Sequence, residues 1–157
     1  MSDASPRPLG KRVVTSPDAP AGTGPYSPAL VVGDFVYVAG QGPLDPLTHE
    51  IRGATIEEQM RLTFKNIGVL LRAAGSSFES VVKVNVYLSD IGNYEKFNAI
   101  YKELFVPPYP VRTTVACILD GIMIEADCVA ILEDGRSRQA SRQRAPARLT
   151  RRQAGNV

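Results

Sequence analysis

Apolar residues recur at helical spacing in two stretches of the chain. The first starts after Thr55 and stops at Gly75, and its apolar positions are Ile56, Met60, Phe64, Ile67, Leu70, Leu71 and Ala74. Thr55 and Glu58 have the spacing of a capping box, which satisfies backbone amides at a helix start. A glycine commonly follows a helix end. The second stretch covers about residues 93–105 and precedes a Pro-Pro pair. We therefore predict two amphipathic helices.

Shorter segments rich in β-branched and apolar residues predict strands. They span residues 29–32, 35–41, 82–88, 112–117 and 122–132. Gly33-Asp34 is a tight-turn signal between the first two. We expect a second hairpin, through Asp120-Gly121, to place the 112–117 strand alongside the 122–132 strand.

The last segment is largely apolar at both even and odd positions, so both faces of its sheet need cover. Two helices can cover only one face of such a sheet. We expect the other face to pack on a second copy of the chain.

Composition divides the chain of 157 residues into three parts. Residues 1–12 lack periodicity and are expected to be a disordered lead, and residues 13–133 form one folded domain. Residues 134–157 contain seven arginines, one acid and no aromatic residue, which predicts a basic disordered tail. The remaining residues carry more acids than bases, so a folded nucleic-acid-binding face is not indicated.

Compartment and redox state follow from what the sequence lacks. It has neither a signal-peptide pattern nor an apolar run long enough to span a bilayer, so we expect a cytoplasmic protein. Cys117 and Cys128 lie in apolar segments, and two buried reduced thiols are favoured over a disulfide.

The side chains available for chemistry are few. The chain has no dinucleotide, Walker A, zinc-protease or nucleophile-elbow motif, and His49, its one histidine, is expected in a solvated loop. We expect neither a cofactor nor a metal. Glu125 and Asp127 share one face of the last strand. Arg112 would lie beside them across the expected hairpin, and an ion pair is favoured there over a guanidinium left for a ligand carboxylate.

Five short segments nevertheless occur in an order that is similar to a known family. They are residues 24–28 (GPYSP), 39–46 (AGQGPLDP), 98–101 (NAIY), 110–115 (PVRTTV) and 124–127 (IEAD). Over about residues 20–132 the chain resembles the Rid (YjgF) family of reactive intermediate/imine deaminases. The resemblance implies an α+β, chorismate-mutase-like fold with a six-stranded mixed sheet and two helices on one face. It also implies a barrel-forming homotrimer with sites between subunits.

The resemblance further implies hydrolysis of 2-imino acids, or their enamine tautomers, to 2-keto acids and ammonia without a cofactor. Arg112 matches the arginine that binds the substrate carboxylate, and Glu125 matches the glutamate that positions or activates water. Tyr26 would line the cleft, and Gly40 would bring backbone amides near the ligand. Thr114 is assigned to substrate binding with them.

The resemblance also concerns two residues of the second predicted helix, and the chain departs from the family pattern at three places. Asn98 is assigned to substrate binding, although a structural hydrogen bond is as good an interpretation, and Tyr101 is equally well a core ring. Ala39 replaces a serine of many active members, and Thr114 replaces a frequent cysteine. The connection 115–124 is shorter than usual. Two alternatives remain: a non-catalytic metabolite-binding trimer, and an RNA-binding or endoribonuclease-type translation inhibitor with weak phosphate contacts from the tail.

Overall fold

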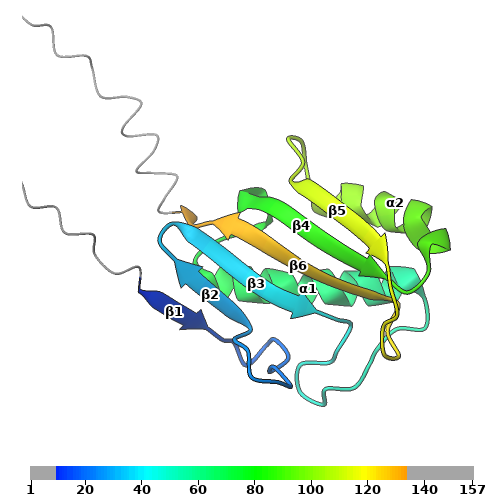
Figure 1. Cartoon of the computed structure of the whole chain (residues 1–157), viewed down its shortest axis with the longest axis horizontal. Coiled ribbons are helices and arrows are strands. Elements are labelled where there is room, and N and C mark those ends of the chain that lie inside the picture. The colour runs from blue at the N-terminus through cyan, green and yellow to red at the C-terminus, as the bar shows by residue number, and fades with distance from the viewer. Residues whose placement is uncertain (1–9, 134–157) are drawn as a thin grey trace, which may run out of the picture.

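The computed structural model describes residues 10–133, which form one mixed six-stranded sheet with two helices on one face (Figure 1). The predictions of a disordered lead and a basic tail fall almost wholly on residues 1–9 and 134–157, outside the described part. The strands lie in the order β1-β2-β3-β6-β4-β5. Their bounds are β1 Lys11–Val14, β2 Ala29–Val32, β3 Phe35–Gln41, β4 Val81–Leu88, β5 Val111–Ala116 and β6 Ile124–Ile131.

The first strand, β1, is not among the segments that the sequence pattern predicts, and it begins inside the stretch expected to be a disordered lead. Lys11 and Arg12 pair with Val32 and Val31 of β2, so β1 starts two residues before the boundary expected at residue 13. The other strands begin or end within two residues of the predicted segments. The Gly33-Asp34 hairpin between β2 and β3 is confirmed.

The two helices are those that the periodicity predicts: α1 is Ile56–Ala74 and α2 is Tyr94–Leu104. The Thr55 hydroxyl accepts from the Glu58 amide at 3.2 Å, and the Glu58 carboxylate accepts from the Thr55 amide at 3.2 Å, which confirms the capping box. Gly75 ends α1 with a φ of 92°, a left-handed conformation that glycine adopts without strain. Two short 3-10 turns, η1 (Phe78–Ser80) and η2 (Ile91–Asn93), precede β4 and α2 respectively.

The predicted hairpin between β5 and β6 is wrong. β5 pairs in parallel with β4, whereas β6 runs antiparallel between β4 and β3. The physical reason is the crossover through α2, because a strand followed by a helix and another strand returns in the same direction. The chain does bend at Asp120-Gly121, but the strand β4 separates the two strands that this segment connects.

The core lies between the sheet and the helices. Even-numbered residues of β6, from Ile124 to Ala130, are buried against large side chains of α1 and α2 such as Phe64 and Phe97. Cys128 is buried as expected, but Cys117 is exposed, contrary to prediction. Cys117 lies just past the end of β5, and β5 is an edge strand.

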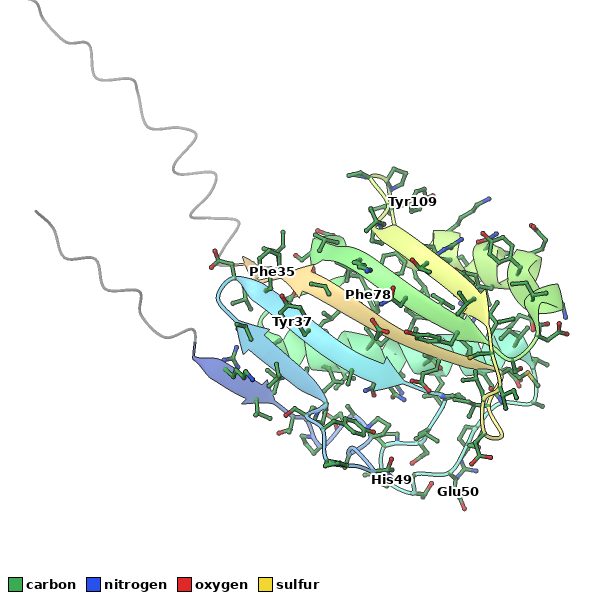
Figure 2. All side chains as sticks on the ribbon, in the orientation of Figure 1. Phe35, Tyr37, His49, Glu50, Phe78 and Tyr109 are labelled. Carbon is green, nitrogen blue, oxygen red and sulfur yellow. The ribbon has the colours of Figure 1, made fainter. Side chains whose placement is uncertain are left out.

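The opposite face of the sheet is not covered by any helix of residues 10–133. Phe35 and Tyr37 of β3 lie on this helix-free face (Figure 2). They are 44% and 46% exposed, and Val111 and Val115 of β5 are 67% and 41% exposed. No helix among residues 10–133 has the length and hydropathy that crossing a bilayer requires.

Candidate functional site

Arg112 lies on the helix side of the edge strand β5. It is in register with the buried Val84 of β4, and its guanidinium packs against α2. Nη2 donates to the Tyr94 hydroxyl at 3.1 Å and to the Asn98 amide oxygen at 2.9 Å. The guanidinium carbon is 4.6 Å from the Tyr101 ring centroid and 4.8 Å from that of Phe97. Helix α2 therefore supplies both hydrogen bonds and aromatic faces to this cation.

The predicted ion pair between Arg112 and an acid of β6 is wrong. None of the ion pairs found within residues 10–133 includes Arg112. Asp127 instead accepts hydrogen bonds from Asn85 at 2.8 Å and from the Tyr87 hydroxyl at 3.3 Å. Because the acceptors around Arg112 are neutral, no carboxylate of the described chain compensates its charge.

An open groove of about 380 Å³ adjoins this guanidinium. Its walls come from α2, β5 and the segment before β5, and its lining residues are Asn98, Tyr101, Lys102, Tyr109, Pro110 and Arg112. The lining contains two cations and no acid. Such a surface favours a small ligand with at least one negative charge.

Two hydroxyl groups lie buried on the same side of the sheet as Arg112. Thr114 follows Arg112 by two positions on β5, and its Oγ1 has no hydrogen-bond partner among the described residues. The Tyr101 hydroxyl also lacks a partner in this part of the chain. Burial raises the pKa of Tyr101 to about 12, so its phenol remains protonated at neutral pH.

Glu125 lies on the helix-free face, in register with Tyr87. Its carboxylate rests against the backbone of Gly40 in β3, where a Cβ would overlap Oε1. Burial raises the pKa of the Glu125 carboxyl, and the negative charge of Asp127 raises it further. A carboxylate with a raised pKa, half-buried beside an open surface, is suited to accept a proton.

Tyr26 and Gly40 lie together at the end of β3. Both line a small pocket of about 40 Å³ between the loop before β2 and the residues that follow β3. Tyr26 is 51% exposed, and its hydroxyl accepts from the Thr23 amide at 3.2 Å. The expected cleft residue is therefore at the surface, a short distance along β3 from the Glu125 carboxylate.

The structure thus collects the predicted residues into two groups. We name Arg112, Asn98 and Thr114 the arginine group, and Glu125, Gly40 and Tyr26 the glutamate group. Strand β4 separates β5 from β6, and the Arg112 and Glu125 side chains lie on opposite faces of the sheet. One chain does not bring the two groups into a single site.

Sequence reasoning missed Tyr94. The available signal is its spacing from Asn98, because residues four apart on a helix share a face. His49 is exposed, as expected, with a φ of 60° in the turn after β3. The described residues hold no cluster of three or more His, Cys, Asp or Glu side chains that could bind a metal ion.

Known proteins are similar to this chain in sequence and in fold. The family model for endoribonuclease L-PSP matches residues 16–132. A RutC family protein of Pyrococcus abyssi is 40% identical over 127 residues, which is 80% of this chain and 100% of that protein. The human 2-iminobutanoate/2-iminopropanoate deaminase is 38% identical over 125 residues, covering 78% of this chain and 91% of the human protein.

Solved structures agree with these relatives. RidA from an Antarctic Psychrobacter has a TM-score of 0.73 at 34% identity, covering 77% of this chain and 99% of that one. TdcF of E. coli, solved with bound serine, has a TM-score of 0.71 at 28% identity, covering 76% and 98%. The chain therefore belongs to the Rid (YjgF) family, whose family model carries the description endoribonuclease L-PSP.

Proposed function

We propose that this protein hydrolyses 2-imino acids, or their enamine tautomers, to 2-keto acids and ammonia. The observation that carries the proposal is Arg112, whose guanidinium is held by neutral oxygens beside an open groove without acids. A 2-imino acid always bears a carboxylate next to its reactive carbon. The human relative is named for this activity, and the E. coli structure contains an amino acid, which also has such a carboxylate.

The two groups of residues have complementary parts in this reaction. Arg112 binds the carboxylate and so fixes C2 relative to the attacking water. Glu125 accepts a proton from that water while the water oxygen bonds to C2 and the imine nitrogen takes up a proton from solvent. Glu125 then returns its proton to the amine nitrogen of the carbinolamine. The C–N bond breaks to release ammonia, and the hydroxyl proton passes to solvent as the C=O bond forms. An imine carbon is electrophilic enough that the scheme uses no covalent enzyme intermediate.

The proposal includes a homotrimer in which the arginine group of one copy faces the glutamate group of the next. Support comes from the opposite placement of the two groups within a chain, and from the exposed apolar residues on the helix-free face. An assembly that covers this face removes apolar area from water.

Substitution of Arg112 by alanine tests the proposed function. An amino-acid oxidase generates the imine, semicarbazide traps the unreacted part, and the rate of keto-acid formation is measured. We expect Arg112→Ala to lower kcat/KM on the order of 100-fold or more, because a charged contact to the carboxylate and the position of C2 are both lost. Arg61→Ala is the matched control, since it removes an exposed arginine that pairs with Glu103. Equal activity of Arg112→Ala and wild type would contradict the proposal.

Ala39 favours one second candidate, a carboxylate-binding protein without turnover. Ala39 lies directly before Gly40 and supplies no hydroxyl to the glutamate group. This candidate predicts that calorimetry detects 2-keto acid binding while no imine is hydrolysed. The RNA-binding alternative depends on the arginine-rich tail, which lies outside the described residues.

A further inference from the structure

We infer that Tyr94 is a positioning residue, which fixes the guanidinium of Arg112 through its phenol oxygen and so aligns the carboxylate anchor. The inference rests on the proposed function, because it assigns Arg112 to the substrate. Tyr94 does not line the groove beside Arg112. Its effect is therefore transmitted through the arginine.

The geometry is specific to two positions of α2. Tyr94 and Asn98 are one helical turn apart, and both accept a hydrogen bond from Nη2 of Arg112, at 3.1 and 2.9 Å respectively. A guanidinium has donors only, so the Asn98 amide must present its oxygen and the Tyr94 phenol must accept. The phenol proton remains directed away from this bond.

These bonds decide which arginine donors remain for a ligand. Nη2 has two N–H groups and two acceptors, whereas Nη1 and Nε have no partner within residues 10–133. The ring centroids of Tyr101 and Phe97 lie 4.6 and 4.8 Å from the guanidinium carbon. Such a cation–π contact attracts the charge but does not fix how the guanidinium is turned. The pair of hydrogen bonds to Nη2 does, and it thereby fixes the directions of Nη1 and Nε.

Tyr94 can be tested without disturbing the packing of α2. Its ring lies 6.4 Å from that of Phe97 between centroids, a contact that phenylalanine preserves. Tyr94→Phe therefore removes the hydrogen-bond acceptor alone. Tyr37→Phe is the matched control, since it removes the same atom from a ring on β3 that makes no contact with Arg112.

We expect Tyr94→Phe to raise KM about threefold to tenfold, the usual effect of losing one hydrogen bond, and to change kcat less. The carboxylate is bound alike in substrate and transition state, so a loosened anchor weakens both equally. A loss confined to folding would instead lower the melting temperature and leave KM unchanged, and that result would overturn the inference.

A double-mutant cycle shows whether Tyr94 acts through Arg112. Lysine has no second terminal nitrogen, so Tyr94→Phe is expected to have no further effect on KM in an Arg112→Lys background. An equal rise of KM in both backgrounds would contradict the positioning role.

The dissociation constant of 2-oxobutanoate, measured by calorimetry on the same four proteins, separates the two proposals. If wild type binds this keto acid but hydrolyses no imine, the proposed function is wrong. The role of Tyr94 is then still supported by a loss of affinity that disappears in the Arg112→Lys background. If wild type neither binds nor hydrolyses, both proposals are overturned.

Discussion

The surroundings of Glu125 differ from those of an ordinary surface acid. Burial and the neighbouring charge of Asp127 both raise the pKa of its carboxyl, in that order of size. Gly40 makes this position available, because any side chain there would overlap the carboxylate. Burial and the charge of Asp127 both disfavour the ionised carboxylate, which raises its affinity for a proton.

The first prediction concerns the pH dependence of the reaction. Protonated Glu125 cannot accept a proton from water, so kcat/KM falls as pH is lowered through the raised pKa of this carboxyl. Asp127→Asn removes the nearby negative charge, and we expect the acidic midpoint to move to lower pH. The measurement is a pH profile of kcat/KM for both proteins. A midpoint that stays in place or rises in Asp127→Asn would show that another group controls the acidic limb.

The second prediction is that Glu125→Gln abolishes hydrolysis and stabilises the fold at neutral pH. An acid with a higher pKa in the folded than in the unfolded chain binds its proton more tightly when folded. The free energy of unfolding therefore decreases as pH rises from the ordinary carboxyl value through the raised one. Glutamine removes this penalty.

Thermal unfolding at two pH values checks this second prediction. Glu125→Gln should melt above wild type at pH ~7, and the difference should shrink at pH ~4, which lies below the ordinary carboxyl pKa and further below the raised one. A variant that melts lower than wild type at both values would contradict the sign of the effect.

At the scale of elements, α2 and β5 form a unit with β4. The strand-helix-strand order of residues 81–116 requires β5 to run parallel to β4, and it places α2 directly over Arg112. The two α-helices and the strands β2 to β6 could be predicted from periodicity and caps, within about two residues at their ends, whereas the four-residue strand β1 was missed. The strand order could not, because hydrophobic alternation fixes which residues share a face but not which strand is next.

That limit explains the error about Arg112. Alternation alone leaves open whether Arg112 faces the same side of the sheet as Glu125. The expected hairpin placed the two side by side, which is wrong. The parallel crossover puts Arg112 beside Val84 on the helix side and leaves Glu125 beside Tyr87 on the other. The tyrosine at position 94 was missed for the same reason, since its relevance depends on α2 packing over β5.

Helix α1 fixes the loop after β3 through buried amide side chains, which yields the third prediction. Asn66 is 1% exposed, and its Nδ2 donates to the carbonyl oxygens of Gly42 and Leu44 at 3.1 and 2.9 Å. Asn66→Leu keeps a similar volume but leaves both carbonyls without this donor. We expect a loss of about 1–3 kcal/mol in the free energy of unfolding, measured by urea denaturation.

The control for this third prediction is Lys65→Leu, which changes the exposed neighbour on the same helix and unpairs no carbonyl. If both variants lose equal stability, the amide bonds of Asn66 are not the cause. Gln59 lies two turns before Asn66 on α1. Its Nε2 donates to the Gly53 carbonyl oxygen at 3.0 Å, and its Oε1 accepts from the Met123 amide, just before β6, at 2.7 Å. The loop after β3 is therefore held by α1 as well as by its own backbone hydrogen bonds.

At the scale of the whole molecule, the arrangement of the two groups distinguishes a shared site from a single-chain site. Arg112 lies at the edge strand on the helix side, and Glu125 lies on the helix-free face with β4 between their strands. If the proposed trimer is correct, each site takes Arg112 from one copy and Glu125 from its neighbour. A chain that lacks Arg112 and a chain that lacks Glu125 can then form one intact site together, because each supplies the residue that the other lacks.

The fourth prediction is that two inactive variants restore activity when their subunits are mixed. Arg112→Ala and Glu125→Gln are unfolded together in equal amounts and refolded, so that trimers of mixed composition form. A site works only where an intact Arg112 meets an intact Glu125 from the neighbouring copy, which random assembly provides at about a quarter of the interfaces. The mixture should therefore recover up to about a quarter of wild-type imine hydrolysis, whereas each variant refolded alone stays inactive. Light scattering on each sample confirms assembly. If both residues acted within one chain, every chain in the mixture would carry one defect, and no activity would return.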